Sequence, residues 1–202
     1  MLTRMGIGDA EGLAQHKWHV REEVRRRRAA MGSDERLRAR DALTDRLISL
    51  VRDRGASSVS CYASLPDEPD TSAFLEWALD NGVEVLLPVS LTGSRLAWTH
   101  SDGSQLVPGR HGILEPSGEQ LPASAAAALD LMLIPACAVD LRGTRLGWGL
   151  GYFDRCLSEL ARRPPLFAVV HEADVLPALP AEPHDIPVDG AVTPDAVRLF
   201  PR

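Results

Sequence analysis

The sequence predicts an α/β fold in which a mostly parallel sheet is flanked by helices on both faces and preceded by an N-terminal helical segment. Short apolar segments, each suited to one buried strand, alternate with segments whose apolar residues recur at helical spacing. Such strands are apolar along their length because helices cover both faces of a parallel sheet. A glycine-rich stretch joins one of these apolar segments to a helical one. Together these three observations favour the α/β class.

The helical segments are recognised by their spacing and their end signals. Residues 9–30 are rich in arginine and are predicted to form the first helix. Ser33 or Asp34 can cap a second helix, whose leucines share one face. Two further helices are predicted at 71–81, ending at an Asn-Gly pair, and at 151–162.

The predicted strands are short and apolar. They lie at residues 57–63, 83–89, 95–99, 131–134 and 166–170. Ligands of such sheets usually lie beyond the carboxyl ends of the strands, so the loops after these strands are where a site is expected. The alanine-rich segment 122–129 is compatible with a loop or with a helical turn.

Composition is ordinary for a globular protein of one domain, or at most two small ones. The chain has 202 residues and a formal net charge of −6, which gives no indication of a nucleic-acid partner. Cys61, Cys137 and Cys156 form no C-x-x-C pair and are expected to be buried thiols. Neither a signal peptide nor a membrane-spanning segment is recognised, so a cytoplasmic protein without membrane partners is expected.

The connection from residue 134 to 155 has the properties of a phosphate-binding loop. Its glycines let backbone N–H groups approach an anion; they are Gly143, Gly147, Gly149 and Gly151. A helix expected to start near the last of them directs its positive dipole end at the same place. Arg142, Arg145 and Arg155 add cations that suit phosphate. Neither a Walker A nor a G-x-G-x-x-G pattern is present, so spacing alone indicates a phosphate or nucleotide loop, against the alternative of a flexible glycine turn.

Four basic residues form a stripe on the first predicted helix. Lys17, Arg21, Arg25 and Arg28 follow one another at helical spacing. The spacing is compatible with a phosphate-binding face, with a solvated basic face and with a nucleic-acid contact. His171 follows a predicted strand and is interpreted as structural rather than as a site residue.

The glycine-rich segment resembles a known family signature. Gly143-Thr-Arg-Leu-Gly-Trp-Gly-Leu-Gly-Tyr-Phe-Asp-Arg155 is similar to G-x-R-L-G-x-G-x-G, two aromatic residues, D and R, of the 5-formyltetrahydrofolate cyclo-ligases. Other family features follow in order: Lys17-Trp-His-Val-Arg21, Glu68-Pro-Asp-Thr71, Pro88, Gly112-Ile-Leu-Glu-Pro116, His184-Asp185 and Thr193. The resemblance runs from about Lys17 to Thr193. Residues 1–16 are therefore expected to be a mobile extension and residues 17–202 a single cyclo-ligase-like domain.

The resemblance implies an ATP- and Mg²⁺-dependent enzyme. The family converts 5-formyltetrahydrofolate to 5,10-methenyltetrahydrofolate, with phosphorylation of the formyl oxygen and release of ADP and phosphate. The implied cofactors are ATP and Mg²⁺, and the implied partner is the folate, with or without a polyglutamate tail. No nucleic acid is implied, and a monomer is expected.

The resemblance also implies roles for individual residues. Arg145 and Tyr152 would be catalytic. The nucleotide would contact Lys17, Arg21, Arg145, Leu146, Gly147, Trp148, Gly149, Leu150, Gly151, Tyr152 and Phe153. The folate would contact Glu68, Trp148 and Tyr152. Asp154 and Asp185 would bind Mg²⁺, with Asp189 as the alternative to the second.

Some assignments remain open within the resemblance. Arg25 and Arg28 are interpreted as mostly solvated, and Glu115 as ordering the loop around the site. Trp148 stands where relatives often carry a basic or polar residue, so it either weakens an anion contact or stacks on a folate ring. Leu150 also departs from the pattern. The two other hypotheses are a catalytically silent relative that binds nucleotide or folate, and a nucleic-acid binder.

Overall fold

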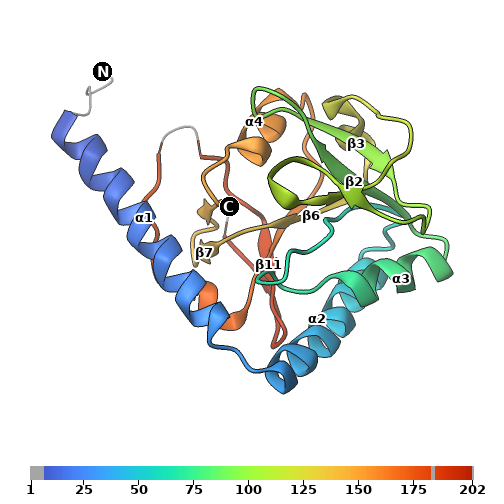
Figure 1. The fold of residues 1–202 in the computed structure, drawn as a ribbon, viewed down its shortest axis with the longest axis horizontal. Helices are drawn as coiled ribbons and strands as arrows, with labels where there is room; N and C mark the ends of the chain where they lie inside the picture. Colours follow the sequence, from blue (N-terminus) through green and yellow to red (C-terminus); the bar gives the residue numbers. More distant parts are fainter. Residues whose placement is uncertain (1–6, 183–184, 202) are drawn as a thin grey trace.

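The structure is a computed structural model that describes residues 7–182 and 185–201. His184 of the family-like segment and the first six residues of the predicted extension lie outside these ranges. The centre is a seven-stranded sheet of order β12-β11-β9-β6-β1-β2-β3 (Figure 1). Five of its strands are mutually parallel, and the edge strands β3 and β12 are antiparallel to their neighbours. The predicted α/β class with a mostly parallel sheet is confirmed.

The strands of the main sheet are short, and all except the edge strand β12 are mostly buried. They are β1 (Ser58–Ser60), β2 (Glu84–Ser90), β3 (Leu96–His100), β6 (Leu131–Pro135), β9 (Leu166–Val169), β11 (Gly190–Val192) and β12 (Val197–Leu199). In β6, Leu131 and Leu133 pack into one hydrophobic cluster, whereas Met132 and Ile134 pack into the other. Successive side chains of a strand point to opposite faces, so a continuous apolar run indicates a sheet covered on both faces.

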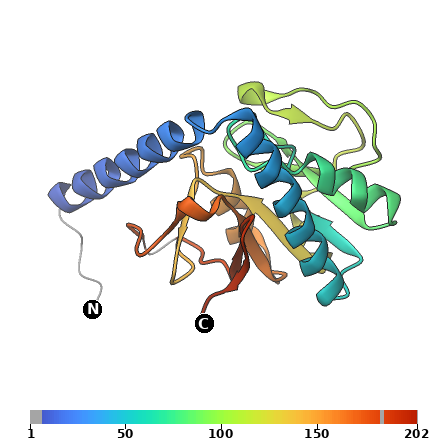
Figure 2. The same ribbon diagram turned by 90° about the horizontal axis from the view of Figure 1, so that it is seen from below.

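Helices cover the two faces of the sheet. On one face lie α2 (Ser33–Asp53) and α3 (Ser72–Asp80), which bury Leu43, Leu47 and Phe74 against the strands. On the other lie α4 (Tyr152–Glu159) and the 3-10 turn η2 (Ala123–Ala128), the alanine-rich segment. The N-terminal α1 (Ile7–Ala29) runs along one side of the molecule and projects from it (Figures 1 and 2). Within the described residues, no helix is both long and apolar enough to cross a membrane.

Several boundaries differ from the sequence-based expectation. α1 begins at Ile7, so the boundary predicted after residue 16 falls inside a continuous helix. α4 ends at Glu159 instead of residue 162, because Leu160 is already extended and buries its side chain. Strand β1 ends at Ser60, although Cys61 still donates its N–H to Leu86 O.

The connection between β6 and α4 contains structure that the sequence did not indicate. β7 (Ala138–Asp140) and β8 (Arg145–Leu146) form an antiparallel hairpin, and β10 (Val175–Leu176) pairs with β7. Asp140 Oδ1 accepts hydrogen bonds from the N–H groups of Arg142 and Thr144, which closes the turn. A second small hairpin, β4 (Val107–Pro108) with β5 (Leu114–Glu115), lies beyond β3. All three cysteines are buried, as expected.

Candidate functional site

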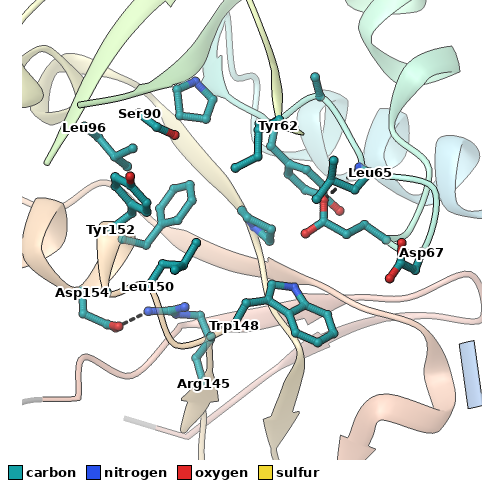
Figure 3. A pocket seen from close by; sticks show the side chains of 18 of the residues that line it. Tyr62, Leu65, Asp67, Ser90, Leu96, Arg145, Trp148, Leu150, Tyr152 and Asp154 are labelled. Carbon is teal, nitrogen blue, oxygen red and sulfur yellow. Dashed lines mark hydrogen bonds and ion pairs between the residues drawn. The ribbon is translucent and has the colours of Figure 1, made fainter. Parts of the chain in front are cut away.

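A cavity of about 380 Å³ lies at the carboxyl ends of β1, β2 and β6 (Figure 3). The loop after β1 and the end of β2 form one wall, and the loop from β8 to α4 forms the other. The loop after β9, also expected to contribute, instead lines a different hollow beside α1 and α2. Parallel strands end at the same edge of a sheet, which brings these distant segments together.

The glycine-rich loop reaches the cavity in a backbone conformation that favours glycine. Gly149 has a φ of 95°, and Gly151, the residue before α4, has a φ of 70°. Both values lie in the left-handed region that other residues seldom adopt. Gly147, Trp148, Leu150 and Gly151 line the cavity together with Tyr152 and Phe153. The backbone of the predicted loop thus borders the cavity directly.

Arg145 is the most buried cation of the cavity. It lies on β8 with 6% of its surface exposed and forms an ion pair with Asp154 in the first turn of α4. Burial lowers the pKa of its guanidinium, and the charges of Asp154 and Asp185 oppose that shift. Its Nε atom is buried without a hydrogen-bond acceptor among the described residues. Arg145 therefore places a positive charge beside the cavity, held by Asp154, and its Nε–H remains able to donate a hydrogen bond to a ligand.

The two predicted metal ligands are placed differently. Asp154 lines the cavity, whereas Asp185 does not. Asp185 lies in the loop before β11, where its Oδ2 accepts hydrogen bonds from Lys17 Nζ at 3.1 Å and from the Glu182 N–H at 2.8 Å. Asp189, the alternative, accepts a hydrogen bond from the Leu166 N–H at 2.8 Å and so joins its loop to β9. No group of three metal-binding side chains occurs among the described residues.

Lys17 and Arg21 join α1 to two different loops, the one before β11 and the glycine-rich one. Lys17 Nζ pairs with Glu182 at 2.6 Å as well as with Asp185, and these two partners raise its pKa against the opposing effect of burial. Arg21 Nε donates a hydrogen bond to Gly147 O at 2.8 Å. Neither side chain lines the cavity itself. Both therefore fix the position of α1 against the loops that carry Asp185 and Gly147.

The interpretation of Arg25 and Arg28 as mostly solvated is wrong for Arg28 and incomplete for Arg25. Arg28 is 1% exposed and pairs with Asp174 at 2.8 Å. Arg25 is half-exposed and pairs with Glu22, but it lines the cavity. Helix α1 lies over the β6–β7 connection, so the basic side chains on this face of the helix contact protein instead of solvent.

Glu68 occupies the wall opposite the glycine-rich loop. Its Oε2 accepts a hydrogen bond from the Leu65 N–H at 3.0 Å. Burial raises the pKa of its carboxyl, while that N–H, Arg28 and the nearby indole N–H of Trp148 oppose the shift. The Glu68–Trp148 approach is not a hydrogen bond of ordinary geometry, since Trp148 Nε1 has no partner among the described residues. An acceptor and a donor thus flank the same part of the cavity.

Leu146 does not line the cavity. It is 3% exposed and packs with Val24 and Cys137 in a small hydrophobic cluster. Neighbouring residues of a strand point in opposite directions, so Arg145 and Leu146 cannot both face the cavity. The Leu146 side chain thus has a packing role, and the predicted contact of this residue with the nucleotide stays a prediction.

Other cavity residues gave little sign of a role in the sequence. Tyr62 follows β1, and its hydroxyl donates a hydrogen bond to Pro69 O at 3.1 Å. Ile113, between β4 and β5, and Leu96 on β3 add apolar wall. The position of Tyr62 at a strand end was the one available signal, because Ile113 and Leu96 reach the cavity only through the tertiary fold.

Glu115 orders the wall without lining it. It is buried and accepts a hydrogen bond from the Ser90 N–H at 2.8 Å, which joins β5 to the end of β2. Ser90 itself lines the cavity. This geometry agrees with the expected loop-ordering role.

A parallel sheet with a glycine-rich loop and a buried arginine at its carboxyl edge defines an α/β protein equipped to bind an anionic ligand there. A family model described as the 5-formyltetrahydrofolate cyclo-ligase family matches residues 13–194. The chain belongs to this family, and it is a ligase.

Individual relatives agree with the family match. The chain is 37% identical to a 5-formyltetrahydrofolate cyclo-ligase of Mycolicibacterium smegmatis, over 68% of this chain and 73% of the relative. A mouse protein of the same name is 27% identical, over 88% and 93%. The solved structure of an Aquifex aeolicus 5,10-methenyltetrahydrofolate synthetase is 29% identical and superimposes with a TM-score of 0.78, covering 92% of this chain and 93% of that one.

Proposed function

We propose that this enzyme cyclises 5-formyltetrahydrofolate to 5,10-methenyltetrahydrofolate, with consumption of ATP and release of ADP and phosphate. The observation that carries the proposal is Arg145, a buried cation whose Nε finds no acceptor in the described part of the chain, beside a glycine-rich loop and a largely apolar cavity. The formyl oxygen is a poor leaving group, and its phosphorylation makes the adjacent carbon open to attack by N10 of the folate. Alignment and charge stabilisation are the main requirements of such a transfer.

The residues at the cavity fit a nucleotide phosphate and a magnesium ion. The backbone of Gly147, Gly149 and Gly151 would approach the phosphates, and Arg145 would pair with their charge. Asp154 would hold Mg²⁺, which often takes only one or two protein carboxylates beside phosphate oxygens and water. When bound, Mg²⁺ would neutralise charge on the phosphates. Asp185 would serve as the second carboxylate after a shift in its contact with Lys17.

The other cavity residues position the folate and exclude water. Glu68 would accept hydrogen bonds from the amino-pyrimidine edge of the pterin. Tyr152 and Phe153 would cover the reacting groups, since both line the cavity at the start of α4. Exclusion of water would strengthen the pairing of Arg145 with developing negative charge. We also expect a cytoplasmic monomer.

The test is turnover of 5-formyltetrahydrofolate with Mg-ATP, followed by near-ultraviolet absorbance of the methenyl product. For Arg145→Lys and Asp154→Asn we expect kcat to fall at least about 100-fold. The first change keeps the positive charge but removes the planar guanidinium that pairs with phosphate, and the second removes the negative charge that would hold Mg²⁺. Arg142→Ala is the matched control, since Arg142 is exposed in the β7–β8 turn, and it should retain activity. Wild-type protein that binds ATP but forms no product would indicate the silent relative instead.

A further inference from the structure

Trp148 is part of the glycine-rich loop, and its side chain packs against helix α1. Its side chain packs against the cluster formed by Val24, Cys137 and Leu146. The guanidinium carbons of Arg25 and Arg28 each lie 5.3 Å from the centroid of the indole ring. Cation–π attraction at these distances stabilises the observed ring position.

One of these two cations is itself immobilised. Arg28 donates hydrogen bonds to Ala136 O at 3.1 Å and Cys137 O at 3.0 Å, besides its ion pair with Asp174. The indole therefore rests on a group that cannot move aside without loss of several interactions. The π surface of the indole already contacts the two arginines, so the ring face is a less favourable place for a ligand than the ring edge.

The edge of the indole, in contrast, is unsatisfied. Nε1 is buried and donates no hydrogen bond to any of the described residues. Trp148 lines the cavity, and Figure 3 shows its nitrogen edge directed toward the side where Tyr62 and Leu65 lie. A buried N–H without an acceptor destabilises the protein unless a ligand or water accepts from it.

An acceptor group stands close to this donor. Glu68 lines the same part of the cavity, and its Oε2 already accepts from the Leu65 N–H. The carboxylate and the indole N–H do not form a hydrogen bond of ordinary geometry with each other. The pair can instead receive a planar heterocycle that carries a donor and an acceptor on neighbouring atoms, as cyclic amides and amino-pyrimidines do.

We propose that Trp148 is a specificity-determining residue that donates its indole N–H to an acceptor of the substrate heterocycle, beside the donors that Glu68 accepts. This inference rests on the proposed function, in which that heterocycle is the pterin of the folate. It assigns Trp148 to the folate and not to the nucleotide, and it assigns the contact to the ring edge and not to the ring face.

The first measurement is the indole N–H spectrum of the wild-type protein labelled with ¹⁵N-tryptophan. The four tryptophans give separable signals, and loss of one signal in each Trp→Phe variant assigns them. We expect 5-formyltetrahydrofolate without ATP to shift the Trp148 signal downfield and slow its solvent exchange, while Mg-ATP alone leaves it in place. An unmoved Trp148 signal at saturating folate, or a response to Mg-ATP alone, would overturn the inference.

The second measurement is kinetic. Trp148→Phe keeps an aromatic ring for Arg25 and Arg28 but lacks the N–H. We expect about a tenfold higher KM for 5-formyltetrahydrofolate, the effect of one lost hydrogen bond, with the KM for ATP nearly unchanged. Trp77→Phe is the matched control, because Trp77 packs on Phe74 in α3, away from the cavity. An unchanged folate KM, or a rise in the ATP KM alone, would contradict the assignment.

The two proposals fail in different ways. Wild-type protein without turnover refutes the proposed reaction, whereas the labelled indole still reports whether the heterocycle binds at Trp148. Normal wild-type turnover, together with a Trp148→Phe enzyme of unchanged folate KM, refutes only the role of Trp148.

Discussion

Arg28 shows how one side chain can join distant parts of this protein. From α1 it reaches the carbonyls of Ala136 and Cys137 beyond β6, and its carboxylate partner, Asp174, lies in the 3-10 turn after β9. A buried charge is tolerated because its hydrogen bonds replace those lost from water. The same side chain also contacts the Trp148 ring at the cavity.

Removal of this guanidinium should destabilise the whole protein. For Arg28→Ala we expect the free energy of unfolding to fall by about 3 kcal/mol, because Asp174 stays buried after losing one of its ion-pair partners and keeps its pairing with Arg27. Urea denaturation measures this change. Arg46→Ala, at an exposed position of α2, is the control and should alter the free energy by less than about 0.5 kcal/mol. Equal stability of the two variants would contradict the role of Arg28.

His171 should make stability depend on pH. Neither ring nitrogen has a hydrogen-bond partner among the described residues. Burial, with a smaller contribution from Arg28, lowers its pKa to about 4, although Asp174 acts in the opposite direction. Below the usual pKa of about 6.5 the unfolded state therefore binds a proton that the folded state excludes, and stability falls as pH decreases from there toward 4.

The expected loss through His171 is at most about 3 kcal/mol at pH 4, relative to pH 7. His171→Gln should remove this part of the pH dependence. His100→Gln should leave it intact, because His100 is exposed beside Glu84. Denaturation midpoints between pH 4 and pH 7 provide the measurement, and identical pH profiles for wild type and His171→Gln would rule the explanation out.

At the scale of elements, the segment from β8 to α4 determines the form of the cavity. Arg145 leaves β8 toward the cavity, Gly149 and Gly151 follow with left-handed backbone, and α4 begins at Tyr152. Arg21 holds this segment through Gly147 O. The loop conformation is thus fixed from both ends and from α1.

A side chain at position 149 should disturb this conformation. For Gly149→Ala we expect kcat/KM to fall about tenfold, because alanine at a φ of 95° costs roughly 1–2 kcal/mol and the loop would change shape. Direct collision is not the cause, since the nearest Arg21 atom would lie 3.5 Å from the new Cβ. Gly12→Ala in α1 is the control and should raise stability by about 0.5–1 kcal/mol with unchanged activity. Steady-state kinetics and thermal unfolding distinguish the two.

At the scale of the whole molecule, the sheet and its two layers form one body to which α1 is attached along a limited surface. Among the described side chains of α1, contacts with the rest of the chain are made by Lys17, Arg21, Val24 and Arg28. In the described part before Lys17, Leu13 is the one residue from 11 to 16 that is half-buried, and its neighbours are exposed.

Deletion of residues 1–16 should therefore leave fold and activity largely intact. We expect the free energy of unfolding to change by less than about 0.5 kcal/mol, because residues 11–16, the part of this segment whose burial is described, bury little surface. Deletion of residues 1–21 should lower activity, since it removes the Lys17 and Arg21 contacts. Turnover and thermal unfolding of the two truncated proteins test this, and a loss of folding in the shorter deletion would contradict it.

The sequence by itself determined the fold class, the helices, five of the seven strands of the main sheet (all but β11 and β12), and the loop that carries Arg145, Trp148 and Asp154. These features are local, because strand and helix periodicity, the helix-ending Asn-Gly pair and glycine spacing each depend only on residues close together in the sequence. The family follows from the same local pattern. Glu68 and Tyr152 were found in this way, and both line the cavity.

Only the tertiary structure decided which charges are buried and which side chains meet. Nothing local distinguishes Arg28 from Arg25, and nothing in the sequence places Ile113 at the same cavity as the glycine-rich loop. The β7–β8 hairpin was missed because its strands are short and gain their pairing from β10, far along the chain. Burial and pairing depend on contacts between residues distant in sequence, and those contacts exist only once the sheet has assembled.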